Sequence, residues 1–417
     1  MISNLLQQKH IVYFLFYITF IISFILGENS SSGAAQDHFS LQIFQEQISN
    51  NINSGINFFI EKGQGHSPVF YIIKSIFENI IGKPGSDIFF LTLGFFIPVV
   101  FYTILKKNFR EVDKKLLFAI SLILYLSPYV RSSAVWATND NFAILFFLLS
   151  LSKFINFEKK NNKSDIIYSF LYLVIAAYVR QYFIMIFIIY GIFLLRNNSI
   201  KFILYLVFFN IILLTPWFFY LYKQFYFNLF LTTYEENYIS SGFLKPNLIY
   251  NFLIFCSMYL FYILPFVLNM DLYKKIKSYI SDHKIYLLIF LSIFIIIYIQ
   301  YELPFNQLGG GAFYKISLLI NSKLFFISSS FAGLLLILLT VKINFRNLIV
   351  LIIFFFMFPF IVIYQKYYDP MMLIIFFGLI KSDLIYEQFK KKKINMKIVF
   401  TFFLLFLIGS NIYYFYK

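Results

Sequence analysis

Long apolar stretches recur along this chain, and short polar segments separate them. A helix needs about 20 apolar residues to cross the hydrocarbon core of a bilayer, which is about 30 Å thick. Most of the stretches approach this length. The pattern predicts an all-α, polytopic membrane protein with about thirteen transmembrane helices, near residues 11–27, 87–105, 116–130, 140–155, 165–179, 182–195, 202–222, 248–269, 285–300, 324–341, 347–364, 370–386 and 398–414.

The longest early polar segment, from Glu28 to Pro68, directly follows the first apolar stretch. Residues 69–81 come next, and they are too short and too interrupted by polar residues to form a span. Lys74 and Glu78 lie four positions apart, so a helix would carry both on one face. This predicts an amphipathic helix over 69–81 that lies at the membrane surface, within a first outer loop that covers residues 28–86.

The composition supports a membrane protein, because 60% of the residues are hydrophobic and only 13% are charged. Soluble domains are about a quarter charged. The evenly recurring apolar stretches favour one integral membrane domain over residues 1–417. Residues 1–27 could also be a signal peptide, since Lys9 and His10 precede an apolar stretch. That stretch is long and lacks a clear cleavage pattern before Glu28, so a retained anchor is favoured.

The net charge of +16 is distributed in a way that predicts topology. Most of the 35 lysines and arginines lie in alternate short connections, and such connections face the cytoplasm. The N-terminus is then inside, while the C-terminus and residues 28–86 are outside. No nucleic-acid partner is expected. We expect a multi-pass protein of the bacterial inner membrane, with its active site facing the periplasm or exterior.

Two residues of the first outer loop are candidates for chemistry. Asp37 precedes several apolar positions that could hold it near the bilayer, where a carboxylate can act as a general base. Its alternative role is a solvated loop acid. His66 precedes Ser67 and Pro68, which suit the start of a helix. At that positive helix end His66 could bind a phosphate or a sugar, or it could simply be exposed.

Three cations on the outer side are candidates for substrate binding. Arg131 follows an apolar stretch, and Arg180 joins two of them. An ionisable group at membrane depth costs free energy and is therefore often functional. A guanidinium grips a phosphate through two hydrogen bonds. The structural alternatives are an ion pair between Arg131 and Asp140, or a side chain that reaches the interface. Lys366 is a weaker phosphate candidate, near Asp369, which we expect to cap the next helix.

The sequence predicts no cofactor. Its one cysteine, Cys256, offers neither an internal disulfide nor a metal cluster. Patterns of zinc proteases, serine hydrolases and P-loop nucleotide-binding proteins are missing from the sequence. A dedicated metal site cannot be argued from the spacing of residues, and the sequence leaves open whether a divalent metal ion takes part.

Taken together, these residues resemble a family pattern. An acid in Gln36-Asp37-His38, then His66-Ser67-Pro68 before a membrane-surface helix, then a dozen spans, is similar to the GT-C class of membrane glycosyltransferases. The motif around Arg180, YVRQYF, also resembles the alpha-1,2-glucosyltransferase branch. Two departures stand out. Many relatives carry a second acid where this chain has His38, and His-Ser-Pro replaces the commoner His-Pro-Pro or Pro-Pro.

The resemblance implies a glycosyltransferase that uses a polyprenyl-phosphate sugar. Asp37 would be the catalytic carboxylate, and it would act as a base that accepts the proton of the acceptor hydroxyl. Arg131, Arg180 and Lys366 would neutralise the leaving phosphate, with His66 near the substrate. The acceptor would be a glycan, a lipid or a protein, and membrane lipid would surround the chain. Two alternatives remain: a flippase or transporter of lipid-linked glycans, and a polysaccharide polymerase or ligase.

Overall fold

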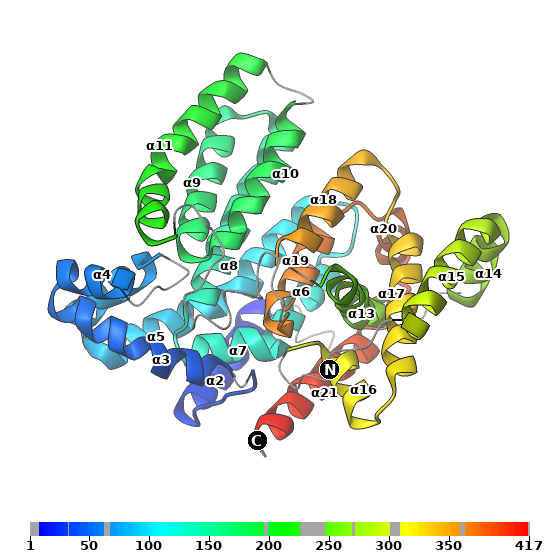
Figure 1. Ribbon diagram of the computed structural model, residues 1–417, viewed down its shortest axis with the longest axis horizontal. Helices are drawn as coiled ribbons and strands as arrows, with labels where there is room; N and C mark the ends of the chain where they lie inside the picture. Colours follow the sequence, from blue (N-terminus) through cyan, green and yellow to red (C-terminus); the bar gives the residue numbers. More distant parts are fainter. Residues whose placement is uncertain are drawn as a thin grey trace. The chain divides into compact units, whose positions relative to one another are not determined.

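The computed structural model describes residues 8–31, 33–61, 67–195, 199–225, 247–268, 272–300, 309–358 and 363–415. Within these ranges every regular element is a helix (Figure 1), and one isolated β-bridge joins Gly310 to Tyr364. The predicted all-α class is therefore confirmed. The chain divides into two compact units: Met1–Asn108, Leu117–Phe243 and Phe403–Lys417 form the first, and Phe109–Leu116 with Leu244–Phe402 form the second.

The helices of the first unit come from the N-terminal half of the chain. They are α2 (Lys9–Ile25), α3 (Gly33–Asn50), α4 (Ile52–Glu61), α5 (Val69–Asn108), α6 (Lys114–Leu122), η1 (Ile123–Leu126), α7 (Pro128–Val135), α8 (Asn139–Lys160), α9 (Lys163–Val179), η2 (Gln181–Phe183), α10 (Ile184–Leu195) and α11 (Ile200–Phe225), where η marks a short 3-10 helix and α6 begins in the second unit.

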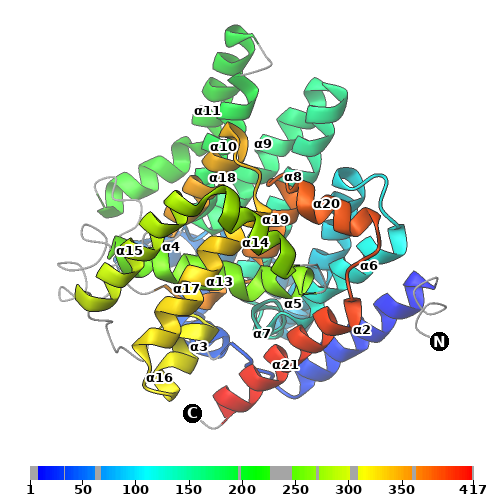
Figure 2. The same cartoon turned by 90° about the vertical axis from the view of Figure 1, so that its right-hand side faces the viewer.

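The second unit contains the later helices. They are α13 (Leu248–Val267), α14 (Leu272–Asp282), α15 (Lys284–Gln300), α16 (Ala312–Leu319), α17 (Lys323–Thr340), α18 (Phe345–Phe356), η3 (Gln365–Tyr367), α19 (Met371–Gly378) and α20 (Asp383–Lys390), and α21 (Met396–Phe415) continues into the first unit. In Figure 2, α13, α16 and α17 pack against one another.

Five of the described helices are long and apolar enough to cross a membrane: α5, α8, α13, α17 and α21. The number rises to seven if two bent pairs, one of α6–η1 with α7 and one of α14 with α15, each form one span. These helices are compatible with a multi-pass membrane protein. Thirteen spans were predicted, and the described residues support five to seven by length and composition. Other predicted stretches form apolar helices of 10–17 residues, among them α2 with 17 residues and α18 with 12.

The stretch predicted as one span over 370–386 forms two helices. α19 ends at Gly378, and α20 begins at Asp383 after Ser382, whose side chain accepts a hydrogen bond from the amide of Ile385. A serine at this position satisfies one of the free amides of a new helix, so it marks a helix start. Asp369 was expected to cap α19, but the N-cap position is occupied by Pro370 and shows no side-chain capping bond.

The predicted helix over 69–81 is present as the first part of α5, which breaks at Gly82. A straight helix would separate residues 74 and 87 by about 20 Å, at 1.5 Å per residue. Instead Lys74 Nζ lies 3.1 Å from Asp87 Oδ1, and the ring of Phe77 stacks on that of Phe89 at 4.2 Å. The chain therefore folds back at Gly82, where φ is 75° and ψ is 162°.

Aromatic side chains fill much of both cores. In the first unit the buried ring of Tyr125 stacks between Phe16 and Phe95, and its hydroxyl donates to the Phe95 carbonyl at 3.0 Å. In the second unit the backbones of α13 and α17 approach so closely that a Cβ at Gly333 would collide with the carbonyl of Cys256. The many aromatic residues thus serve as packing material.

Candidate functional site

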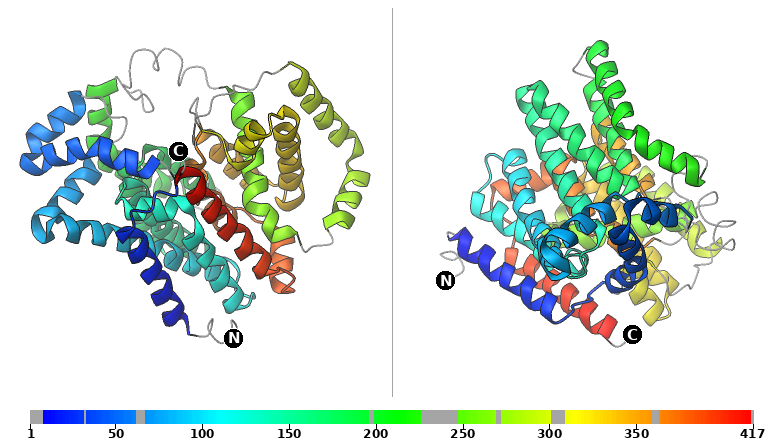
Figure 3. Two further views of the ribbon diagram at one scale, coloured as in Figure 1. Left: turned by 90° about the horizontal axis from the view of Figure 1, so that it is seen from below. Right: turned by 90° about the vertical axis from the view of Figure 1, so that its left-hand side faces the viewer.

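A cavity of about 370 Å³, lined mostly by polar residues, lies within the first unit. Its walls come from one face of α3, from the first part of α5 with Lys83 just after the break, and from the turn between α7 and α8. Figure 3 shows α3, α4 and the first part of α5 side by side, as their contacts require. Ligand pockets in proteins usually measure about 300–1,000 Å³, so this cavity can hold a small ligand group.

The α3 wall follows directly from helical periodicity. The segment was predicted only as part of an outer loop, but residues 33–50 are helical. Residues 38, 41, 42, 45 and 49 face the cavity, at the spacing of three and four residues that brings side chains onto one helix face. On another face Phe44 and Ile48 are buried, and Phe44 packs against Phe59 of α4. α3 is therefore held by its apolar side and presents polar groups to the cavity.

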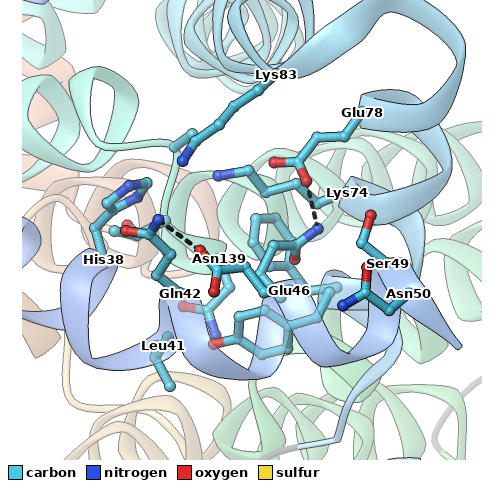
Figure 4. Close-up of a pocket in the computed structure, with 15 residues that line it drawn as sticks. His38, Leu41, Gln42, Glu46, Ser49, Asn50, Lys74, Glu78, Lys83 and Asn139 are labelled. Carbon is cyan, nitrogen blue, oxygen red and sulfur yellow. Dashed lines mark hydrogen bonds between the residues drawn. The ribbon is translucent and has the colours of Figure 1, made fainter. Parts of the chain in front are cut away.

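Cationic and carboxylate groups occupy the cavity wall together. Figure 4 shows the amino groups of Lys74 and Lys83 directed toward the side of the cavity that holds His38. The carboxylates are those of Glu46 and Glu78. Gln42 donates to Glu46 at 2.9 Å, and Gln45 donates to Glu78 at 3.1 Å (dashed lines in Figure 4). Amide side chains thus fix both carboxylates along α3.

His38 is held in a defined orientation. Its Nδ1 lies 2.8 Å from the carbonyl oxygen of Trp136, and a carbonyl only accepts, so Nδ1 carries the proton. Burial lowers the pKa of His38, and the positive charges of Lys74 and Lys83 lower it further, while the Trp136 carbonyl and Asp87 act in the opposite sense. The imidazole is therefore neutral near pH 7, and its Nε2 is a hydrogen-bond acceptor.

Asp37 lies on α3 immediately before His38 and is partly buried. It is close enough to act electrostatically on Arg180, which forms a 2.7 Å salt bridge with Asp140. Burial alone would lower the pKa of Arg180, but Asp140 and more weakly Asp37 raise it above its usual value. Because Asp140 follows Asn139 of the cavity wall, the structure brings Asp37 and Arg180 together beside the cavity.

Arg131 lies elsewhere, in a buried ionic cluster at the end of α2. Its guanidinium bonds both carboxylate oxygens of Glu28, at 2.8 to 3.1 Å, and also contacts Thr19 and Ser23. Burial alone would raise the pKa of Glu28, but Arg131 holds it below the usual value. The carboxylate of Glu28 therefore pairs with Arg131, and Asp140, suggested from the sequence as its partner, pairs with Arg180 instead.

Two sequence candidates remain, His66 and Lys366. His66 lies outside the described residues. Its neighbour Ser67 is buried, donates to the carbonyl of Tyr178 and lies 3.4 Å from the amide of Val69, as expected for a residue that starts α5. Lys366 belongs to η3 of the second unit, with its amino group 5.7 Å from the ring centre of Tyr364.

Sequence reasoning missed most of the cavity wall. Lys83, Gln45 and Asn139 were not singled out, and Lys74 and Glu78 were noted only as an interfacial pair. The available signal was the recurrence of polar residues at helical spacing through 38–50. Among the described residues, no group of three or more histidine, cysteine or acidic side chains is placed to hold a metal ion.

The chain was compared with models of protein families, with curated proteins and with solved structures. None of the three comparisons yields a match. Its function is therefore argued from the cavity and its surroundings.

Proposed function

We propose that this protein is a membrane glycosyltransferase of the GT-C kind. It would move a sugar from a polyprenyl-phosphate donor to a glycan, lipid or protein acceptor at the outer membrane face. The proposal includes thirteen spans, an inside N-terminus and a helix 69–81 at the outer surface. The observation that carries it is a cavity lined mostly by polar residues in a chain that is 60% hydrophobic. The cavity is built on the segment after the first apolar helix and is flanked by Asp37.

In the proposed reaction Asp37 accepts the proton of the acceptor hydroxyl. The acceptor oxygen then forms a bond to the anomeric carbon of the sugar. The bond from that carbon to the phosphate oxygen breaks, and its electron pair stays on the phosphate. A direct displacement of this kind inverts the anomeric configuration. Arg180, His66 and Lys366 remain candidates for the substrate phosphate, whereas Arg131 already binds Glu28.

The test uses the full-length protein in lipid vesicles with acceptor lipids from the cell envelope. A panel of radiolabelled polyprenyl-phosphate sugars supplies donors, and transfer of label is measured. Asp37→Asn keeps the size of the side chain but removes the base, so transfer should fall at least about a hundredfold. Glu61→Gln, in the same segment but away from the cavity wall, should retain activity.

Two outcomes would overturn the proposal. If wild-type protein transfers no sugar from any donor of the panel, the transferase assignment fails. If transfer occurs but Asp37→Asn equals wild type, Asp37 is not the base. Vesicles loaded with fluorescent lipid-linked glycan distinguish the transporter alternative, because a flippase would change the accessible fraction of glycan without new glycosidic bonds. A polymerase or ligase would lengthen or attach a whole glycan instead of one sugar.

A further inference from the structure

The cavity beside α3 has an unsatisfied hydrogen-bond donor in its wall. Asn139 is only 2% exposed, and its Nδ2 has no hydrogen-bond partner among the described residues. A buried amide without a partner costs roughly 1–3 kcal/mol, so such groups are usually satisfied by a ligand or by water. Because Asn139 lines the cavity, a ligand there can accept this bond.

Positive charge is concentrated beside this donor. The amino groups of Lys74 and Lys83 both lie within electrostatic range of His38. Lys74 is buried and pairs with Asp87 at 3.1 Å. Lys83 is exposed to the cavity, and no salt bridge to it is found in the part of the chain that the structure describes. An anion placed here would meet an uncompensated ammonium group.

The start of α8 adds to the same end of the cavity. Thr138 is the N-cap of this helix of 22 residues but makes no side-chain capping bond. Thr138 and Asn139 both line the cavity. The first amides of a helix attract anions, because they carry partial positive charge. Asp140 in this first turn offsets part of that charge, and its carboxylate is already paired with Arg180.

Unsatisfied acceptors lie further along α3. Gln45 is buried and donates its amide to Glu78, which leaves Gln45 Oε1 and Glu78 Oε1 without partners among the described residues. Glu46 lies on the same helix face. Carboxylate and amide oxygens accept hydrogen bonds from hydroxyl groups. The two orphaned oxygens are therefore suited to a ligand that carries hydroxyl donors.

We propose that the cavity binds a sugar phosphate lengthwise along α3. Its phosphate would contact Lys83, Asn139 and the start of α8, and its hydroxyls would contact Gln45 and Glu78. From residue 38 to residue 45 the helix axis rises about 10 Å, which suits one sugar with its phosphate. The lipid-linked source of this ligand rests on the proposed function, whereas a free sugar phosphate would need only the cavity.

Binding is measured on full-length protein in nanodiscs through tryptophan fluorescence. The chain has two tryptophans, and Trp136 lies with its ring 5.7 Å from that of His38. In a Trp217→Phe background the signal comes from Trp136 alone. The probes are inorganic phosphate, the free hexoses, a panel of soluble hexose 1-phosphates, and polyprenyl-phosphate hexoses in the nanodisc. We expect the hexose phosphates to bind more tightly than either phosphate or hexose alone.

Variants at the two ends should have separate effects. Lys83→Gln and Asn139→Ala should each weaken the binding of both phosphate and hexose phosphate. For Lys83→Gln the loss of a charged hydrogen bond should raise Kd about 10- to 100-fold. Glu78→Gln should weaken hexose phosphate but leave inorganic phosphate unchanged. Lys163→Gln removes one positive charge from an exposed position outside the cavity wall, and it should bind every probe like the wild-type protein.

The pH dependence gives an independent readout. A bound phosphate faces His38 together with Lys74 and Lys83, with Asp87 and the Trp136 carbonyl as the opposing groups. The anion raises the pKa of His38, which is below its usual 6.5 in the free protein, so binding takes up a proton. Affinity for the phosphodiester donor should rise as the pH falls toward and below 6.5. His38→Gln should lose this dependence.

The outcomes separate the site from the reaction. If Lys83→Gln and Asn139→Ala bind all probes like wild type, or if hexoses bind as tightly as their phosphates, the sugar-phosphate site is refuted. Binding of soluble hexose phosphates but of no lipid-linked sugar supports the site and refutes the lipid donor. Binding of lipid-linked sugar without transfer supports the site and refutes the transferase proposal.

Discussion

At the scale of single residues, Arg131 and Arg180 differ in their surroundings. The side chain of Arg131 is 9% exposed and that of its partner Glu28 is 11% exposed. Arg180 is 18% exposed and lies near Asp37 and Asp140 at the edge of the cavity. A guanidinium enclosed on Glu28, Thr19 and Ser23 has few donors left for a substrate. Arg131 therefore stabilises the fold, and Arg180 is the one of these two arginines that lies beside the cavity.

Removing Arg131 should destabilise the protein strongly. In Arg131→Ala the carboxylate of Glu28 is left buried without its cation, and breaking such a pair typically costs about 3–5 kcal/mol. Unfolding followed by heat or denaturant in detergent should show this loss. Because Glu28 has a lowered pKa in the folded state, the pair stabilises the protein above pH 4.5. Its contribution is lost as the pH falls through that lower folded-state value.

Arg110, which is exposed, provides the matched control. Arg110→Ala should change the unfolding free energy by less than about 0.5 kcal/mol. The substrate-binding role expected from the sequence would regain support if Arg131→Ala unfolded like wild type but lost donor binding.

The partners of these arginines could not be predicted from the sequence. Arg131 and Glu28 are 103 positions apart, and the sequence offered the nearby Asp140 instead. Asp37 was recognisable as a candidate because it follows the first apolar stretch within a family-like motif. Asn139 was not recognisable, since its significance comes from a buried amide without a partner. Such a property depends on what surrounds the side chain in three dimensions.

At the scale of elements, the break in α5 positions one wall of the cavity. Lys74 and Glu78 precede Gly82, and Lys83 follows it. The fold-back brings the two parts of α5 together through Lys74–Asp87 and Phe77–Phe89. The combination of φ 75° and ψ 162° at Gly82 is accessible in practice only to glycine. One glycine thus determines where three of the charged groups lie.

Gly82→Ala should therefore disturb the fold. Although the added methyl group meets only Pro84, at 3.9 Å, the backbone conformation costs about 1–3 kcal/mol for a residue with a Cβ. Thermal unfolding in detergent measures this loss. Gly191→Ala is the control, because the added carbon has nothing within 4 Å. Alanine there should stabilise α10 by up to about 1 kcal/mol. Equal stability of the two variants would contradict strain at Gly82.

Elements with a strong pattern could be predicted from the sequence, and others could not. The helix over 69–81 and the helices α8, α13 and α17 lie close to their predicted ranges. α3 was missed because its polar and apolar residues balance, so the segment reads as a polar loop. The predicted span 370–386 forms two helices instead of one. Apolar content does not show whether a helix is continuous, and Ser382 starts a new helix by capping it.

At the scale of the whole molecule, the proposed topology predicts which surfaces can be labelled from outside. Ser40 on α3 and Asn161 after α8 are both exposed. In a Cys256→Ala background, a membrane-impermeant thiol reagent should label Ser40→Cys in intact cells but should label Asn161→Cys only after permeabilisation.

Because both positions are exposed, unequal labelling reports the side of the membrane and not burial. Labelling of Asn161→Cys alone in intact cells would reverse the topology and place the cavity in the cytoplasm. That result would refute a donor that is delivered to the outer face.

The close approach of α13 and α17 also limits how this sequence can vary. Even a methyl group at position 333 would collide with the backbone of Cys256, so the two helices would have to separate before any other residue could occupy it. Proteins that share this architecture should therefore keep a glycine there even when little else of the sequence survives. Where overall sequence similarity is too weak to detect, distant relatives can be sought by a pattern of sterically constrained positions. In that pattern Gly82 and Gly333 keep their spacing from the surrounding apolar stretches.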